Sequence, residues 1–151
     1  MMKKILFVCH GNICRSPMAE FVMKDMVQKE GIDMYVASAA TSTEEIGNPV
    51  HYGTRQKLAE VGLSVSARAA VQMTKADYAK YDYIIGMDSA NIRNIIRIAG
   101  GDPDGKVFKL LSFAGSERDV ADPWYTGDFE ATYMDVLAGC RGLMEEINKG
   151  L

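Results

Sequence analysis

The sequence lacks long apolar runs, an excess of basic residues and many cysteines, and each absence removes a class of protein. No stretch approaches the roughly 18 apolar residues of a membrane span, so no membrane insertion is expected. Lys and Arg number 17 against 20 Asp and Glu, which argues against a domain built to neutralise nucleic-acid phosphates. The apolar run after Lys3 and Lys4 ends at Cys9, too short for an export signal. The 3 cysteines therefore predict a cytoplasmic protein rather than a disulfide scaffold.

No repeat, low-complexity tract or linker divides the 151 residues, so we expect a single domain over residues 1–151. Short apolar runs alternate with helical patterns, which predicts an α/β fold. We expect strands at Lys4–Val8, Met34–Ala39, Tyr83–Met87 and Val107–Leu111. We expect helices from Pro17, with Ser16 as N-cap, to Gly31, at Tyr52–Val61, at Ser89–Ala99, and through the apolar residues from Phe129 to Ile147. With right-handed crossovers this becomes a small, doubly wound three-layer sandwich, whose four parallel strands have the order 2-1-3-4 and helices on both faces.

The loop after the first expected strand carries the strongest chemical signal. In such sheets ligands bind beyond the carboxyl ends of the strands, where this loop lies. A loop that wraps over a helix N-terminus aims several backbone N–H groups at one point and forms a phosphate-sized anion cradle. Gly11 allows close approach of the backbone, Asn12 tolerates left-handed geometry, and Arg15 offers a bidentate fork for phosphate oxygens. The expected phosphate-binding residues are His10, Gly11, Asn12, Ile13, Cys14, Arg15 and Ser16.

Cys9 stands at the base of this loop and is the candidate nucleophile. The helix dipole, Arg15 and the Ser16 hydroxyl all favour a thiolate at this position. A second candidate, Asp122, is held in a loop by Pro123 and could supply the proton that a departing alkoxide or phenoxide needs.

The motif Cys-x-Gly-Asn-x-Cys-Arg-Ser-Pro, which begins at Cys9, resembles the signature of the low-molecular-weight protein tyrosine phosphatases. The resemblance continues through Ser38-Ala39-Ala40, Met87-Asp88-x-x-Asn91 and Asp122-Pro123-Trp124-Tyr125, so it covers nearly the whole chain. It implies a phosphotyrosine phosphatase with a Cys9 phosphoenzyme, in which Asp122 acts first as general acid and then as base.

The same resemblance implies roles for the surrounding residues. Asn12, Ser16 and Ser38 would form a support shell for the loop. Flat apolar walls for a phosphotyrosine ring are expected from Trp124 and Tyr125, beside Ile13 and Glu44. Cys14 would form a reversible disulfide with the nucleophile.

Some of these residues also have simpler explanations. Asp88 could serve only as a helix N-cap, Trp124 and Tyr125 could pack in the core, and Cys140 falls on the buried stripe of the last helix. His10 is expected to face the surface of the loop. The acidic pair Glu44 and Glu45 is expected to disfavour strongly acidic peptides.

Four other functions remain open. Cys9, His10 and Cys14 have finger-like spacing, with His51 or Cys140 as completion, but Arg15 would repel a metal ion. An arsenate reductase shares the loop but needs further thiols, and Tyr83–Asn91 contains none. Phosphoarginine phosphatases carry Thr where this chain has Ile13, so tyrosine is favoured. A catalytically dead phosphopeptide-binding module would usually have lost the nucleophile or the acid.

No metal or other cofactor is implied, because the anion cradle and Arg15 supply the electrostatic stabilisation that metals provide elsewhere. The expected partners are a phosphotyrosyl protein or peptide and, in the site, phosphate or other oxyanions. We expect a monomer or weak dimer.

Overall fold

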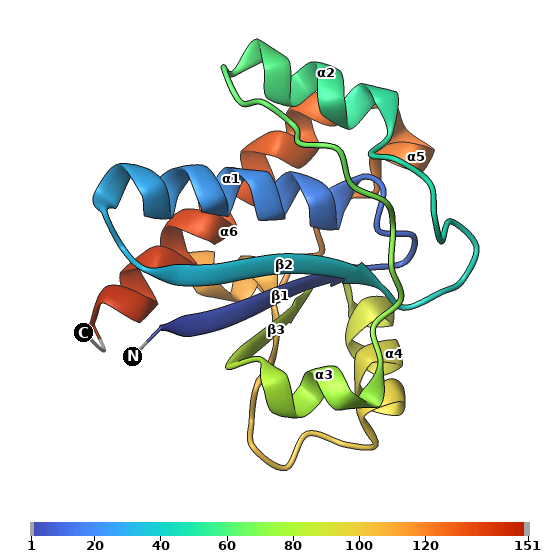
Figure 1. Cartoon of the computed structure of the whole chain (residues 1–151), viewed down its shortest axis with the longest axis vertical. Helices are drawn as coiled ribbons and strands as arrows, with labels where there is room; N and C mark the ends of the chain where they lie inside the picture. Colours follow the sequence, from blue (N-terminus) through green and yellow to red (C-terminus); the bar gives the residue numbers. More distant parts are fainter. Residues whose placement is uncertain (1, 150–151) are drawn as a thin grey trace.

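A parallel sheet of four strands, in the order β2-β1-β3-β4, forms the middle layer of the computed structural model, which describes residues 2–149 (Figure 1). The predicted α/β fold and strand order are therefore confirmed. The elements are β1 (Lys3–Cys9), α1 (Arg15–Glu30), β2 (Met34–Ala40), α2 (Tyr52–Glu60), α3 (Lys75–Lys80), β3 (Tyr83–Gly86), α4 (Ser89–Ala99), β4 (Val107–Lys109), the 3-10 helix η1 (Leu110–Ala114), α5 (Pro123–Thr126) and α6 (Phe129–Lys149).

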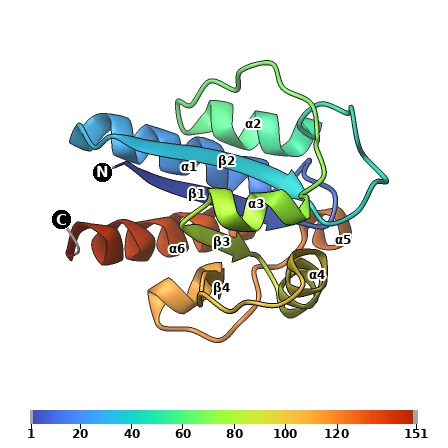
Figure 2. The same cartoon turned by 60° about the horizontal axis from the view of Figure 1, so that its bottom comes forward.

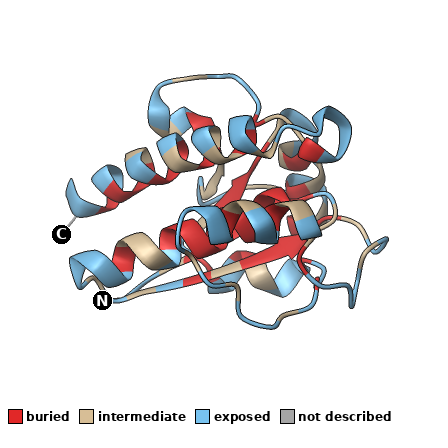
Figure 3. Cartoon of the chain, turned by 90° about the horizontal axis from the view of Figure 1, so that it is seen from above, coloured by how far each residue is buried: buried red, intermediate tan, exposed pale blue. Residues whose placement is uncertain are grey.

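The central strand β1 supplies both hydrophobic cores because successive side chains point to opposite faces of the sheet. Ile5 and Phe7 pack with α1 and α6, whereas Leu6 and Val8 pack with α3 and α4. Figure 3 shows the buried residues on the strands and the inward faces of the helices. At one end of the molecule the tip of β2, α5 and α4 gather around the loop that follows β1 (Figure 2). This end holds the residues of interest.

The fourth strand is shorter than its apolar run predicts. β4 ends at Lys109, and the chain continues as η1. Leu110 and Leu111 are both buried, because η1 turns toward α6 and packs against it. Gly139 in α6 makes room for Leu110, since a Cβ there would overlap its side chain.

Helix α1 begins two residues earlier than predicted. Its N-cap is Cys14, and the first helical hydrogen bond runs from the Met18 N–H to the Cys14 carbonyl at 3.1 Å. Ser16 is thus inside the helix and not its N-cap, because its hydroxyl bonds to groups of the preceding loop instead. Gly31 ends the helix in the left-handed conformation, with φ of 67°, as expected.

Two helices were not anticipated from the sequence. The short helix α3 begins where the Asp77 carboxylate accepts a hydrogen bond from the Thr74 N–H at 2.8 Å, a local capping signal. The single turn α5 places Pro123 in its first position and has Asp122 as its N-cap. Within residues 2–149, none of the helices is long and apolar enough to cross a membrane.

Candidate active site

The loop between β1 and α1 folds back over the start of the helix and points toward the Cys9 sulfur. Asn12 has φ of 58°, the one non-glycine residue with a left-handed backbone in the described chain. This conformation directs the Asn12 N–H at the Cys9 Sγ, at 3.3 Å, while the Ser16 hydroxyl lies 3.0 Å from the same sulfur. Two donors therefore face the sulfur from the loop and the helix, an arrangement that stabilises negative charge there.

The Asn12 side chain is fully buried and fixes the loop from behind. Its Nδ2 donates to the hydroxyls of Ser16, at 2.8 Å, and Ser38, at 2.9 Å. Ser38 donates in turn to the buried carboxylate of Glu20, at 2.5 Å. The Asn12 Oδ1 accepts from Arg68 Nη2 at 2.5 Å. Both ends of the amide are thereby satisfied, which holds the left-handed turn in one conformation.

Arg15 is 3% exposed, and its guanidinium is held by three partners. Nη1 donates to Asp88, at 2.8 Å, and to the Val120 carbonyl, at 2.9 Å, and Nη2 lies 3.4 Å from Asp122. Burial acts to lower the pKa of Arg15, but the negative charges of Cys9, Asp122 and Asp88 outweigh it and raise the pKa. Arg15 is thus a fixed cation at the floor of the site.

Asp122 reaches this site from a loop more than a hundred residues later in the chain. One carboxylate oxygen accepts from the Trp124 N–H at 3.1 Å, and the other faces Arg15. The Asp122 side chain is 26% exposed, so it stands at the boundary between the protein and solvent. The N-cap bond orients this carboxyl toward the loop that begins at Cys9.

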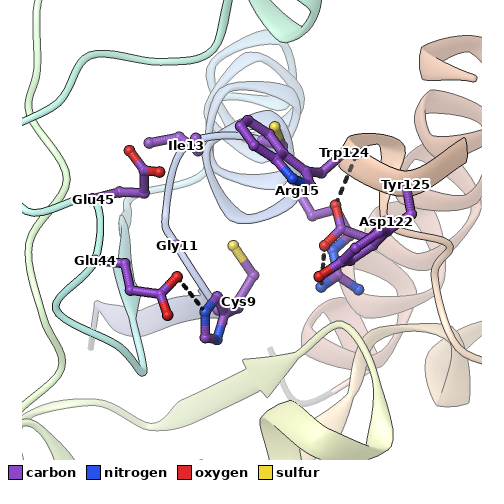
Figure 4. Close-up of a pocket in the computed structure, with 11 residues that line it drawn as sticks. Cys9, Gly11, Ile13, Arg15, Glu44, Glu45, Asp122, Trp124 and Tyr125 are labelled. Atoms are coloured by element: carbon purple, nitrogen blue, oxygen red, sulfur yellow. Dashed lines mark hydrogen bonds and ion pairs between the residues drawn. The ribbon is translucent and has the colours of Figure 1, made fainter. Parts of the chain in front are cut away.

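A cavity of about 230 Å³ opens above the sulfur. In Figure 4, Glu44 and Glu45 stand on one side of Cys9, and Asp122, Trp124 and Tyr125 stand on the other. The lining residues include every expected pocket residue: Cys9, His10, Gly11, Ile13, Cys14, Arg15, Glu44, Glu45, Asp122, Trp124 and Tyr125. Asn12, Ser16 and Ser38 lie behind the sulfur rather than in the cavity wall.

The rim of the cavity is exposed and acidic on one side. The exposed His10 side chain pairs with Glu44, with 3.0 Å between Nε2 and Oε2. Glu45 accepts a hydrogen bond from the Asn48 amide at 2.6 Å. Across the opening, Trp124 is 59% exposed and Tyr125 is 84% exposed, so both aromatics belong to the surface and not to the core.

The three cysteines are free and occupy different environments. Cys14 lines the cavity, and burial together with the charges of Cys9 and Asp122 raises its pKa to about 12. Cys140 lies on the buried face of α6, and burial raises the pKa of its thiol. Among residues 2–149, no three His, Cys, Asp or Glu side chains are grouped so as to hold a metal ion. Cys9, His10 and Cys14 therefore do not form such a group with His51 or Cys140.

The sequence did not indicate Glu20 or Arg68 as residues of this site, and it indicated only one of the two roles of Asp88. Glu20 and Arg68 complete the network behind Asn12, and Asp88 both caps α4, with its Oδ1 2.7 Å from the Asn91 N–H, and holds Arg15. A signal existed for Glu20, since it lies four residues after Ser16 and so shares the face of α1 that carries the Ser16 hydroxyl. No comparable signal marks Arg68.

Comparison with known proteins identifies the family. The model of the low molecular weight phosphotyrosine protein phosphatases matches residues 4–151. The low molecular weight protein-tyrosine-phosphatase YfkJ of Bacillus subtilis is 39% identical over 98% of this chain and 97% of its own length. The crystal structure of YfkJ superposes with a TM-score of 0.95, covering 99% of this chain and 97% of that one.

Two further solved structures are similar at lower TM-scores. The low molecular weight protein tyrosine phosphatase SP-PTP of Streptococcus pyogenes is 44% identical, with a TM-score of 0.87 over 96% of this chain and 93% of its own. The Drosophila arginine phosphatase DARP is 29% identical, with a TM-score of 0.88 over 95% of this chain and 97% of its own. The match over nearly its whole length shows that this chain belongs to the low molecular weight protein tyrosine phosphatase family.

Proposed function

We propose that this phosphatase hydrolyses phosphotyrosine monoesters through a phosphoenzyme on Cys9. The observation that carries the proposal is the single cavity that brings together the Cys9 sulfur, the Arg15 guanidinium and the Asp122 carboxyl. These are a nucleophile, a fixed cation for phosphate oxygens and a proton donor, the three groups that cleavage of a phosphate ester requires.

In the first step the Cys9 thiolate attacks phosphorus and forms the S–P bond, while the bond from phosphorus to the tyrosyl oxygen breaks. Asp122, in its protonated form, gives its proton to the departing phenoxide. Arg15 and the backbone N–H groups of the loop from His10 to Ser16 bind the phosphate oxygens. To do so, Nη2 of Arg15 exchanges its long contact with Asp122 for a phosphate oxygen, while Nη1 stays on Asp88 and Val120.

In the second step Asp122 removes a proton from water, whose oxygen attacks the phosphoenzyme and releases phosphate and the Cys9 thiolate. The donors that face the sulfur, the Asn12 N–H and the Ser16 hydroxyl, stabilise the thiolate as it departs. The buried amide of Asn12 positions this loop and does not itself touch the substrate.

The substrate slot favours an aromatic ester. Trp124 and Tyr125 offer flat walls, and Ile13 adds an apolar contact beside them. A phosphoserine has no ring to contact these walls.

Phosphoarginine is the second candidate substrate, because one solved relative bears the name of an arginine phosphatase and because Glu44 and Glu45 could face a guanidinium. The apolar Ile13 and the two aromatics weigh toward tyrosine. Reduction of arsenate to arsenite is less favoured, since its two electrons must come from a relay of thiols and Cys140 is buried in the core.

The second cysteine of the loop is proposed to protect the first. Peroxide would oxidise the Cys9 thiolate to a sulfenic acid, and Cys14 would condense with it to form a disulfide and water. A reductant would then restore the enzyme. This cycle, and a nucleophile that must be kept reduced, fit the cytoplasm, which we propose as the location. We also propose that the protein acts on phosphotyrosyl proteins as a monomer or weak dimer.

Steady-state hydrolysis of phosphotyrosine, phosphoserine and phosphoarginine, with a chelator present, tests the proposal. The protein should release phosphate from phosphotyrosine, and Cys9→Ser should reduce the rate by about 10⁵-fold or more. Cys140→Ala is the matched control, which removes a thiol from the core and should keep the wild-type rate at temperatures where it is folded. Preference for phosphoarginine would favour the second candidate substrate over phosphotyrosine. Turnover by Cys9→Ser at the wild-type rate would refute the phosphoenzyme.

A further inference from the structure

His51, just before α2, has no role in the proposed mechanism. It contacts the phosphate loop, α2, α5 and α6. Its backbone N–H donates to the Ile13 carbonyl at 2.8 Å, which ties it to the phosphate loop. Its Nδ1 accepts from the Gly53 N–H at 3.0 Å and caps α2. The position of the His51 ring is therefore set by two hydrogen bonds, one on each side of its Cα.

The His51 ring lies between two aromatic side chains from the last third of the chain. The Phe129 ring stacks on it, with centroids 5.6 Å apart and planes inclined by 11°. The Trp124 ring meets it edge to face, at 5.7 Å and 74°. Both geometries are favourable for aromatic pairs.

The Phe129 side of this stack is built by close packing. A Cβ at position 53 would overlap the Phe129 ring, so only glycine allows that ring to lie over the first turn of α2. Lys57, one turn further along α2, pairs with Glu130, beside Phe129. The start of α6 is thus fixed against α2 at the point where His51 projects.

The Trp124 side has much less support. The Trp124 side chain is 59% exposed, and its backbone N–H is held by Asp122. Among the aromatic pairs of the described chain, the Trp124 ring has His51 as its one partner. The edge contact with His51 therefore defines where this wall of the cavity stands.

We propose that His51 is a positioning residue that seats Trp124 as a wall of the substrate slot and so sets the preference for aromatic phosphoesters. The ring of His51 transmits the fixed position of the phosphate loop and of Phe129 to a wall that would otherwise rotate freely at the surface. The kinetic part of this inference rests on the proposed function, and the structural part does not.

Two substitutions separate the ring of His51 from its capping nitrogen. His51→Asn keeps a side-chain acceptor for the Gly53 N–H but has no ring to stack. His51→Phe keeps the ring and loses the acceptor. Tyr52→Ala is the control, since it removes an exposed aromatic from the same turn of α2 that does not line the cavity.

Trp124 is the single tryptophan of the sequence, so fluorescence reports this ring alone. His51→Asn should raise the quenching of Trp124 by acrylamide and the KM for a phosphotyrosine peptide, the latter by about two- to tenfold, the worth of one aromatic pair. The inhibition constant of inorganic phosphate, which needs only the loop, should not change. His51→Phe should keep quenching and KM near wild type and lower the Tm, because the cap is lost, and Tyr52→Ala should leave quenching and KM as in wild type.

Unchanged quenching and KM in His51→Asn would overturn the inference. So would equal shifts in His51→Asn and His51→Phe, since the ring would then not be the cause. If the wild-type protein did not hydrolyse phosphotyrosine, the proposed function would fail, while the quenching series would still decide whether His51 seats Trp124.

Discussion

The two halves of the cavity are built in opposite ways. The half that would hold phosphate is buried and densely hydrogen-bonded, with Asn12 and Ser16 inaccessible and Arg15 held by three partners. The half that would meet the rest of the substrate is exposed, and Tyr125 there has 84% of its surface free. The same cavity thus joins a rigid floor to an adaptable rim.

The difference indicates which property each half controls. Preorganised donors around a nucleophile lower a barrier only if they do not have to rearrange, and burial in a satisfied network provides that rigidity. Exposed side chains contribute less per contact, but they can change without disturbing the floor. We therefore expect substitutions in the floor to affect the rate for every substrate, and substitutions in the rim to affect the choice among substrates.

Asp122 lies where the two halves meet, and Asp122→Asn should have the largest effect among the residues outside the loop. The amide keeps the N-cap bond to the Trp124 N–H but cannot donate the proton, so kcat for phosphotyrosine should fall by about 10²- to 10⁴-fold. The loss should be smaller for p-nitrophenyl phosphate, whose leaving group needs less protonation. An equal loss on both substrates would argue against a general acid.

Asn12→Gly tests whether the floor depends on its hydrogen bonds or only on its backbone shape. Glycine accepts the left-handed conformation but removes the side-chain bonds to Ser16, Ser38 and Arg68, so kcat/KM should fall by about 10- to 100-fold for all substrates. Asn48→Ala, which removes the same type of side chain from the rim, should change kcat/KM by about twofold at most. If Asn12→Gly were as active as wild type, the contrast between floor and rim would be wrong.

The rate at which Cys14 forms a disulfide with oxidised Cys9 should depend on pH. Burial, the largest cause of the raised pKa of Cys14, remains after Cys9 is oxidised and its negative charge is lost, so the Cys14 thiolate fraction at neutral pH is small and rises with pH. Closure of the disulfide after oxidation of Cys9 should accelerate accordingly between about pH 7 and pH 9, measured by mass spectrometry of quenched samples. Cys14→Ser is the control: with no thiol to form the disulfide, continued exposure to peroxide should carry Cys9 on to the sulfinic acid, which dithiothreitol does not reduce. A rate of closure independent of pH would contradict this.

The smallest effect is expected at the acidic rim. Replacement of Glu44 and Glu45 by glutamine should shift the ratio of kcat/KM between acidic and basic phosphotyrosine peptides by about two- to fivefold toward the acidic set, since exposed charges interact weakly. Added salt should reduce the shift. A strong preference of the wild-type protein for acidic peptides would refute the role of this pair.

Most of the fold follows from local patterns. The buried runs around Ile5 and Ile84, the helix that ends at Gly31 and the capping residue Asp88 are each encoded within a few residues. The end of β4 is not, because the turn at Leu110 depends on Gly139, which lies in another element.

The site divides in the same way. Cys9 and Arg15 lie in one short motif, and Asp122 is marked by its proline and its aromatics. Arg68 reaches Asn12 from a segment without regular structure, and its role depends on a long-range contact that no local pattern encodes. Sequence reasoning therefore recovers the residues that carry chemistry more readily than those that hold them in place.

The hydrogen-bond partners of Arg15 lie far along the chain, so the site cannot form until most of the protein has been synthesised. Its contacts with Asp88, the Val120 carbonyl and Asp122 lie 73, 105 and 107 residues further along the chain. A ribosome adds about 5–20 residues per second, so the nucleophile leaves it several seconds before these partners. During that interval Cys9 is present without a fixed cation or an acid, and the emerging chain cannot turn over phosphoesters. The onset of activity in a translation reaction would thus time the docking of the last fifth of the polypeptide.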